Sequence, residues 1–333
     1  MKRFCRHASA TVPDWFRNVA ELRVVPGKLM LAGEYAVLRP HGVALAVAVG
    51  DVVRSKLSLD APGVTMHAFD QTFVLESKPW HATGLLGFVA RALAWLEQHA
   101  GLSLACHLTL DVTGAVGGAK VGLGTSAAVT IATVRAVLED RRVQWSPGQL
   151  AEAARQIHAG GQGTGSGYDV TTIAFGGCVA YERSPDRARH VPWPSGLYGL
   201  ALFSGEPAPT QAALDKVPMA QARLDAIDRA ARYLLQVWSG PPSVILTALQ
   251  ACDDAFVTAA TDDPSLIPPP IAAVRERIVA NGCVTRASGA GGGDCVLAFA
   301  DNADAITRLA HDWQCRGGHL VAHLPADIAP EVV

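Results

Sequence analysis

The sequence predicts an α+β fold in two lobes. Its 333 residues, half of them hydrophobic, are enough for one large domain or two ordinary domains with real cores. Segments with strand and helix periodicity alternate irregularly along the whole chain. Residues 184–196 contain three prolines and several charges, a composition typical of a linker. We therefore expect a first lobe over residues 1–185 and a second over residues 186–333.

In the first lobe, runs rich in valine and leucine predict strands, and apolar residues three or four apart predict helices. The strands are expected at residues 22–25, 43–53, 55–59 and 104–112. The helices are expected at residues 85–99, 126–139 and 150–158. Residues 170–181 predict either a strand or a short helix.

The second lobe follows the same rules. Strands are expected at residues 197–203 and 296–299, and helices at residues 211–238, 243–260 and 271–281. The prolines of residues 264–270 are expected to break the chain between two of these helices. The stretch around His319 and His323 reads as a strand, which would put both side chains on one face.

Charge and cysteine content exclude several classes of protein. A formal charge of −2 argues against a general binder of nucleic acid or membrane surfaces. The seven cysteines include no C-x-x-C pair, which argues against zinc ribbons and disulfide frameworks. The start of the chain lacks the apolar core of a secretory signal, and the run 43–50 is far shorter than the about 20 residues that span a bilayer. We expect a cytoplasmic monomer or homodimer whose partner is a small molecule.

The first of three glycine-rich segments covers residues 25–38 and reads V-P-G-K-L-M-L-A-G-E-Y-A-V-L. Lys28 and Glu34 interrupt an apolar run that otherwise predicts buried structure. A buried charge is costly unless it is paired or functional, so Lys28 is a candidate functional residue. A lysine at a strand end that reaches solvent is the alternative. Glu34 could be an ion-paired residue near the site or a charge at a helix start.

The second glycine segment covers residues 120–129, K-V-G-L-G-T-S-A-A-V, and leads directly into a predicted helix. The N–H groups of a first helical turn lack partners within the helix, and glycines let an anion approach the backbone. The hydroxyls of Thr125 and Ser126 and the ammonium of Lys120 are further phosphate-binding groups. The segment predicts an anion site. The alternatives are a solvated Lys120 and a helix-capping Ser126.

Two known nucleotide-binding patterns can be tested on this segment. The Walker A pattern is absent. The pattern Gly122-x-Gly124-x-x-Ala127 satisfies the loose dinucleotide fingerprint, but no hydrophobic strand leads directly into it. A nicotinamide-dependent dehydrogenase is therefore the alternative from a different class, together with a catalytically silent binding protein.

The third glycine segment covers residues 287–295 and reads A-S-G-A-G-G-G-D-C. Four glycines and a serine between a predicted helix and a predicted strand indicate a backbone cradle rather than a core element. In their order and spacing, the three segments resemble the three motifs of the GHMP kinase superfamily. The resemblance covers nearly the whole chain. It implies a ribosomal S5 domain 2-like first lobe, a ferredoxin-like α+β second lobe, and a Mg²⁺- and ATP-dependent phosphotransferase.

Within that superfamily, the chain is most similar to the phosphomevalonate kinases. The run Gly165-Ser-Gly-Tyr-Asp-Val and the aspartate of the third glycine segment resemble that branch. Mevalonate kinases place a Mg²⁺-binding glutamate where this chain has His158. The absence of that glutamate also favours the phosphomevalonate kinase branch. The resemblance implies conversion of (R)-5-phosphomevalonate to 5-diphosphomevalonate in isoprenoid biosynthesis. Other GHMP kinases, acting on mevalonate, a sugar or an amino-alcohol, are the alternative, and a diphosphomevalonate decarboxylase is a weaker match.

The resemblance also assigns roles to residues. Lys28 would reach the reacting phosphate and the acceptor, with Asp169 beside it. Asp169 would take a proton from an alcohol acceptor, whereas with a phosphate acceptor it would orient Lys28 or help to hold Mg²⁺. A turn-capping aspartate is the alternative. The nucleotide-binding residues would be Lys120, Gly122, Leu123, Gly124, Thr125, Ser126 and Ala127, with Ser126 also a Mg²⁺ ligand. The acceptor-binding residues would be Lys28, Glu34, Ser166, Gly167, Asp169, Thr210, Ser288, Gly289, Ala290, Gly291 and Gly292.

The chain departs from the phosphomevalonate kinase pattern in three places. Residues 161–167 are one residue shorter than the corresponding run and lack its lysine, which removes a cation near the expected acceptor. Thr125 and Pro209 each replace a serine.

Elsewhere, His311, Cys315, His319 and His323 could form a metal site, but exposed or core residues are the default expectation. Cys178 and Cys295 have no histidine nearby in the sequence that would indicate a thiol nucleophile.

Overall fold

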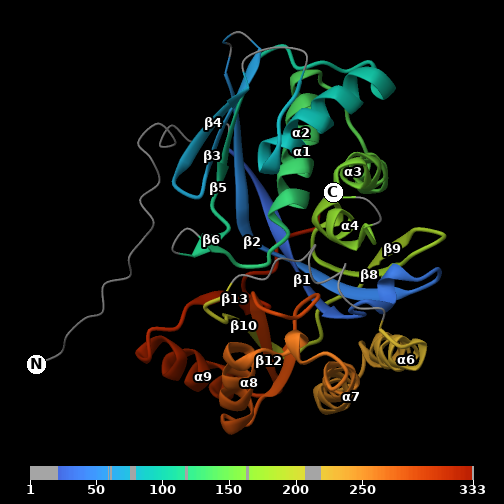
Figure 1. The fold of residues 1–333 in the computed structure, drawn as a ribbon, viewed down its shortest axis with the longest axis vertical. Helices are drawn as coiled ribbons and strands as arrows, with labels where there is room; N and C mark the ends of the chain where they lie inside the picture. Colours follow the sequence, from blue (N-terminus) through green and yellow to red (C-terminus); the bar gives the residue numbers. More distant parts are fainter. Residues whose placement is uncertain are drawn as a thin grey trace, which may run out of the picture.

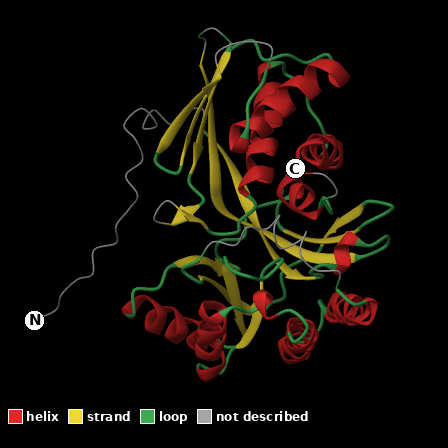
Figure 2. Ribbon diagram, in the orientation of Figure 1, coloured by secondary structure: helices red, strands yellow, loops and turns green. Residues whose placement is uncertain are grey.

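The computed structural model describes residues 22–58, 60, 62–75, 80–116, 119–162, 165–206 and 219–331. Two sheets with their helices lie one above the other (Figure 1). The larger sheet is built from the first half of the chain and the smaller sheet from the second half. Figure 2 shows the helices of the first half gathered on one side of the larger sheet. This is the mixed α+β architecture that the sequence predicts.

The larger sheet has the strand order β4-β3-β5-β2-β8-β9, and β1 pairs with β2 outside this path. Every pair is antiparallel except β3 with β5. The strands are β1 (Arg23–Ala32), β2 (Val43–Ser58), β3 (Gly63–Ala68), β4 (Gln71–Leu75), β5 (His107–Val112), β8 (Cys178–Glu182) and β9 (Arg187–His190). A second small pair, β6 (Ala115–Val116) with β7 (Ala119–Lys120), precedes the second glycine segment.

Four helices cover one side of the larger sheet. They are α1 (Gly84–Trp95), α2 (Thr125–Asp140), α3 (Pro147–Gln162) and α4 (Tyr168–Phe175). A π-helical turn, η4 (Leu96–Ala100), continues α1. The helix α2 is buried on nearly every side because it packs between the sheet and the other helices. Its alanine- and valine-rich sequence fits that position, since a helix that is apolar all round belongs in a core.

The smaller sheet is antiparallel with the strand order β11-β12-β10-β13. Its strands are β10 (Tyr198–Phe203), β11 (Val284–Ala287), β12 (Cys295–Ala300) and β13 (Leu320–Leu324). Helices α8 (Pro269–Ala280) and α9 (Ala303–Cys315) share its main hydrophobic cluster. Helices α6 (Gln221–Val237) and α7 (Pro242–Ala260) pack on each other, and two short 3-10 turns, η3 (Ala36–Leu38) and η5 (Pro264–Leu266), complete the fold.

One described helix, α7, is long and apolar enough to cross a membrane by length and composition alone. Core helices of other proteins satisfy the same criterion. Here Ile245, Leu249 and Phe256 are buried within the fold, and Asp253 on the same helix forms a buried ion pair with Arg275. We therefore describe α7 as a packed helix of the second half.

The two halves are joined by more than the linker. Near its end, the chain returns to the larger sheet, where Gly50 N–H donates to the Asp327 carbonyl and Ala329 N–H donates to the Ala48 carbonyl. One hydrophobic cluster also includes residues from both halves. The domain boundary between residues 185 and 186 therefore stays a prediction.

Most of the expected elements are present, but several differ. Of the helix expected at residues 211–238, the structure shows α6 from Gln221 to Val237, and residues 211–218 lie outside the described residues. The sequence did not predict the short strands β3, β4, β6, β7 and β11 or the helix α9. Residues 170–181 contain the end of a helix and most of a strand, because Gly176 and Gly177 adopt positive φ angles that separate α4 from β8. The expected linker contains β9, which pairs with β8.

Candidate active site

Lys28 lies in the middle of β1, not at its end. The strand is buried from Val25 to Ala32, and the Lys28 residue itself is only 8% exposed. Its Nζ donates a hydrogen bond to the Gly122 carbonyl oxygen at 2.9 Å, and its backbone N–H donates to the Leu123 carbonyl at 2.9 Å. A Cβ atom on Gly27 would lie 2.6 Å from that Leu123 oxygen. Glycine at position 27 therefore lets the first and second glycine segments touch.

The second glycine segment ends at the first turn of α2. Gly124 is the N-cap residue, with φ of +72°, and no side chain caps the helix there. The N–H groups of Thr125 and Ser126 consequently begin a helix whose positive end faces the glycine turn. A Cβ atom on Gly124 would lie 3.2 Å from Cε and Cγ of Lys28, so the lysine stem runs directly beside this turn. The arrangement is a backbone site for an anion with an ammonium next to it.

The start of α4 provides the next part of the site. Gly167 is its N-cap residue with φ of +78°, and Asp169 lies in its first turn. One Asp169 carboxylate oxygen accepts the Val170 N–H at 2.8 Å. The Lys28 Nζ lies 5.7 Å from the centre of the Tyr168 ring. Tyr168 is a site residue that the sequence analysis missed, because its position between Gly167 and Asp169 marks it only as part of a motif.

The third glycine segment reaches the same place from the second half of the chain. The Ser288 hydroxyl accepts the Met30 N–H at 3.1 Å, and the Tyr35 hydroxyl donates to the Ala290 carbonyl at 2.5 Å. Burial raises the pKa of Tyr35, so this hydroxyl stays a donor. Gly292 N–H donates to the Leu266 carbonyl at 2.9 Å. The bond to Met30 fastens the third segment to β1 two residues beyond Lys28, and the bond to Tyr35 fastens it to the residues just after β1.

Lys28 keeps its positive charge in this setting. Burial acts to lower the pKa of Lys28, but Tyr168 and the carboxylates of Asp169 and Asp294 outweigh burial, and the pKa lies above its ordinary value of 10.5. Carboxylates near a buried ammonium offset the free energy that the charge loses when water is removed from around it. It leaves a positive charge at the anion site throughout the neutral pH range.

Glu34 is buried and ion-paired, which is one of the two placements that the sequence analysis gave for it. Its carboxylate is 1% exposed and accepts a hydrogen bond from Nη2 of Arg286, which is fully buried on β11. Nε of Arg286 donates to the Leu31 carbonyl at 3.1 Å. Burial acts to lower the pKa of Arg286, but the Glu34 carboxylate outweighs it and the pKa is raised. Glu34 thus forms a buried ion pair between the two halves, and its contact with an acceptor stays a prediction.

Other predicted site residues lie at the edge of this arrangement. Lys120 is exposed, and its Nζ lies 5.8 Å from the Phe69 ring centre. The Ser166 carbonyl accepts the Tyr181 hydroxyl at 2.8 Å. Leu123 is buried and Ala127 is fully buried, so these two residues support the turn from the core side. Thr210 lies outside the described residues.

Ser126 has a histidine beside it. Its hydroxyl lies 3.2 Å from Nε2 of His158, a buried residue of α3. The centre of the His158 ring lies 4.9 Å from the centre of the Phe88 ring. Among the described residues, no group of three His, Cys, Asp or Glu side chains is placed to hold a metal ion. His311 and Cys315 lie close to each other on α9, but no third ligand of this kind joins them among the described residues. Cys178 and Cys295 are buried, and burial raises the pKa of both thiols, so neither resembles an activated nucleophile.

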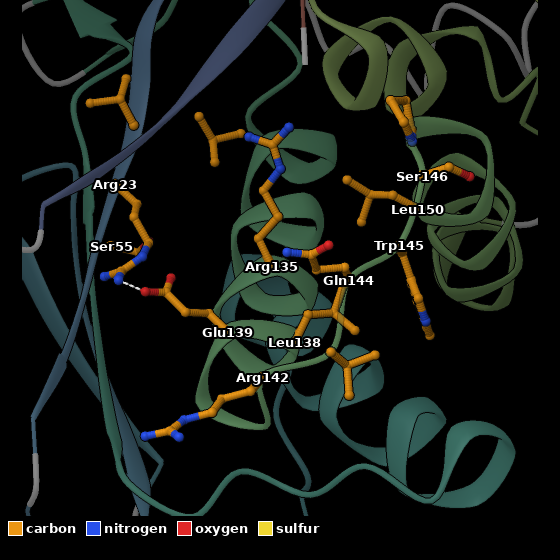
Figure 3. A pocket seen from close by; sticks show the side chains of 14 residues that line it. Arg23, Ser55, Arg135, Leu138, Glu139, Arg142, Gln144, Trp145, Ser146 and Leu150 are labelled. Carbon is orange, nitrogen blue, oxygen red and sulfur yellow. Dashed lines mark ion pairs between the residues drawn. The ribbon is translucent and has the colours of Figure 1, made fainter. Parts of the chain in front are cut away.

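A cavity of about 960 Å³ lies away from these residues. Figure 3 shows it lined by Arg23 at the start of β1, by Arg135 and Glu139 near the end of α2, and by Trp145 just before α3. It therefore lies towards the opposite end of α2 from Gly124. The candidate site is instead defined by the contacts among the three glycine segments and the start of α4.

The arrangement suits the transfer of a phosphoryl group. Such a reaction needs the positioning of two anions and the neutralisation of charge that develops on the transferred group. Backbone N–H groups at the start of α2 provide the first requirement, and the Lys28 ammonium provides the second. The fold argues against the dehydrogenase alternative, because the sheet preceding α2 is largely antiparallel, whereas a dinucleotide fingerprint belongs in a parallel βαβ unit.

Comparison with known proteins agrees with this chemistry. The family model for the GHMP kinases N terminal domain matches residues 87–177, which include the second glycine segment and Asp169. The model for the GHMP kinases C terminal domain matches residues 253–319, which include the third glycine segment. The two matches occur in the expected order along the chain.

Several curated and solved proteins resemble most of the chain. The phosphomevalonate kinase of Streptomyces sp. (strain CL190) is 29% identical, over 89% of this chain and 94% of that protein. The mevalonate kinase of Pyrococcus furiosus is 25% identical, over 83% of this chain and 88% of that protein.

Among solved structures, Streptococcus pneumoniae phosphomevalonate kinase in complex with phosphomevalonate and AMPPNP superposes with a TM-score of 0.79 at 19% identity. That comparison covers 93% of this chain and 99% of the other. Methanococcus jannaschii mevalonate kinase superposes with a TM-score of 0.74 at 15% identity, over 92% and 98% of the two chains. These structures share the fold. The two family-model matches show that the chain carries the N-terminal and C-terminal domains of the GHMP kinases.

Proposed function

We propose that this chain is an ATP-dependent kinase that converts (R)-5-phosphomevalonate to 5-diphosphomevalonate. The observation that carries the kinase chemistry is the position of Lys28. Its buried ammonium bonds to the Gly122 carbonyl of the second glycine segment and lies close to Asp169 of α4. The third glycine segment closes over the same strand through the bond between Ser288 and Met30.

In this proposal the nucleotide phosphates bind against the backbone N–H groups of Gly122 to Ala127, at the start of α2. The acceptor binds between the start of α4 and the third glycine segment, where Ser166, Gly167 and the run from Ser288 to Gly292 contact it. Lys28 lies between the two anions and reduces their repulsion. Lys120 and Thr210 are further proposed contacts, one to the nucleotide and one to the acceptor.

An oxygen of the acceptor phosphate attacks the γ-phosphorus of ATP, and the bond from that phosphorus to the bridging oxygen of ADP breaks. The attacking phosphate has a second pKa of about 6, so it is mostly dianionic at neutral pH and needs no strong base. Asp169 then has the role of holding Lys28 in place. The ammonium stabilises the negative charge on the transferred group as the bond breaks.

A magnesium ion fits the donor groups of the site. Mg²⁺ binds oxygen atoms and keeps nucleotide phosphate oxygens and waters in its coordination shell. The Ser126 hydroxyl at the start of α2 is an oxygen donor of this kind, and we propose that it holds the ion together with the phosphates. When bound, the ion neutralises part of the phosphate charge.

The acceptor assignment is supported by the 29% identity to a phosphomevalonate kinase over 94% of that protein's length. His158 beside Ser126, in place of an acidic residue, also separates this chain from the mevalonate kinase pattern. Mevalonate is the second candidate acceptor. The described residues place few cations around the glycine segments, and an uncharged acceptor end would need fewer of them.

The test is a coupled ADP-release assay with phosphomevalonate, mevalonate, galactose and homoserine as acceptors. We expect the highest kcat/KM with phosphomevalonate and a new diphosphate signal in the ³¹P NMR spectrum of the product. Faster turnover of mevalonate would replace the proposed acceptor by the second candidate. Release of ADP with none of the four acceptors above the rate without acceptor would contradict the proposed function.

A further inference from the structure

Asp294 stands where the third glycine segment enters β12, and its backbone is held in an unusual conformation. Its φ angle is +59°, in the left-handed region that costs most residues about 1–2 kcal/mol. Two hydrogen bonds hold it there: its N–H donates to the Glu206 carbonyl and its carbonyl accepts the Ser204 N–H, both at 2.8 Å. Aspartate and asparagine tolerate this region better than most side chains do.

The Asp294 side chain points at the second glycine segment. A Cβ atom placed on Gly122 would lie 2.6 Å from Cβ and 2.7 Å from Oδ2 of Asp294. The carboxylate therefore occupies the space that any other residue at position 122 would need. The next residue, Cys295, donates from its buried Sγ to the Val121 carbonyl at 2.9 Å. Residues 294 and 295 of the second half therefore contact residues 121 and 122 of the first half, one by close packing and one by a hydrogen bond.

Gly122 is also the residue that binds Lys28. Its carbonyl accepts the Lys28 ammonium at 2.9 Å, while the Asp294 carboxylate lies against its α-carbon. Asp294 and Lys28 are each only 8% exposed, so both charges lie largely out of water, where their attraction is screened less. The groups that act on the ammonium are Tyr168 and Asp169 from α4 and Asp294 from the third glycine segment. One carboxylate of each half of the chain therefore acts on Lys28.

We propose that Asp294 is a positioning residue that, together with Asp169, holds the Lys28 ammonium at the second glycine segment in the geometry needed for phosphoryl transfer. With Asp169 alone, the attraction would come only from the start of α4. With Asp294 as well, a second attraction comes from the side of Gly122. This role rests on the proposed kinase function, and it also makes the positioning of Lys28 depend on contact between the two halves.

The test uses Asp294→Asn, which keeps the shape and the tolerance for positive φ but removes the charge. Asp301→Asn is the matched control, because Asp301 is exposed and follows β12 at the end opposite to Asp294. The chain has six lysines, so lysine labelled with ¹³C at Cε gives few NMR signals, and Lys28→Met identifies the one from Lys28. The readouts are the pKa of Lys28, kcat, and KM for ATP.

We expect Asp294→Asn to lower the pKa of Lys28 by about one unit and kcat by about tenfold, with KM for ATP changed less than about threefold. Asp301→Asn should match the wild type in all three. A wild-type kcat together with an unchanged Lys28 titration in Asp294→Asn would overturn the proposal. A wild-type enzyme that phosphorylates no acceptor would instead overturn the kinase function, and the NMR titration would still decide whether Asp294 acts on Lys28.

Discussion

Breaking the buried ion pair between Glu34 and Arg286 by removing one partner should cost more stability than breaking an exposed ion pair. Arg286 is fully buried, and its guanidinium bonds to Glu34 and to the Leu31 carbonyl. Its Nη1 has no hydrogen-bond partner in the described part of the chain. The substitution Arg286→Met keeps much of the side-chain volume and removes the charge. It leaves a carboxylate in the core without its cation.

The expected loss is large. Removing one partner of a buried ion pair costs about 3–5 kcal/mol, because the remaining charge stays without compensation. Whole domains are stable by only about 5–15 kcal/mol, so Arg286→Met should lose a large part of the free energy of unfolding. The control is Arg277→Met, whose guanidinium pairs with Asp312 at 2.8 Å with both side chains about one-third exposed. Exposed pairs contribute about 0–1 kcal/mol, so this variant should stay close to the wild type.

The loss in Arg286→Met should also depend on pH. Burial raises the pKa of Glu34, and the Arg286 guanidinium opposes that rise. Without Arg286 the folded-state pKa rises further above the unfolded value of about 4.3. A raised carboxyl pKa means stability that is present at low pH and lost as pH increases. The variant should therefore lose stability between about pH 5 and pH 8 more steeply than the wild type.

The assay is equilibrium unfolding in urea, followed by far-UV circular dichroism at several pH values. The double variant Glu34→Leu with Arg286→Met should recover most of the loss, since an apolar replacement of a buried pair is often neutral or stabilising. The reasoning is refuted if Arg286→Met loses less than about 1 kcal/mol. It is also refuted if the double variant is as unstable as the single one.

Three further predictions concern the site itself. Lys28→Met and Asp169→Asn should each lower kcat by at least about a hundredfold while circular dichroism shows an intact fold, and near-normal turnover would contradict their roles. Gly124→Ala should raise the Kd of an ATP analogue at least about tenfold, because its Cβ would lie 3.2 Å from the Lys28 stem. Gly101→Ala has a similar φ of +64° in open space and should leave that Kd unchanged. The pKa of Lys28 is raised above 10.5, so kcat should not fall through deprotonation of Lys28 below about pH 10. A fall of kcat near pH 8 in the wild type that is absent in Lys28→Arg would contradict this prediction.

The sequence predicts those parts of the site that have local signals. Lys28 stands out because a cation interrupts an apolar run, and the second glycine segment stands out because glycines precede a helix. The α+β fold class follows from periodicity, and the strand 107–112 lies within its expected range. The short strands β3 and β4 were not predicted: β3 has only six residues, although they alternate between buried and partly buried from Val64 on, and β4 has five residues that are mostly exposed.

Contacts between distant residues could not be predicted in the same way. Glu34 and Arg286 are 252 residues apart, and no local pattern marks Arg286 as its partner. Tyr168 and Asp294 belong to sequence motifs, but nothing local links them to Lys28. Their effect on Lys28 arises only because three segments meet in the folded chain. The sequence analysis therefore named the ammonium but missed two of the three groups that act on it.

The account depends on Lys28 and Asp169 meeting at the terminal phosphate of a nucleotide bound to the second glycine segment. The most direct measurement is a crystal structure of the chain with Mg²⁺, a non-hydrolysable ATP analogue and phosphomevalonate. We expect the Lys28 Nζ within about 3 Å of an oxygen of the γ-phosphate, and the phosphates against the first N–H groups of α2. A nucleotide bound elsewhere, or a γ-phosphate beyond the reach of Lys28, would contradict the account.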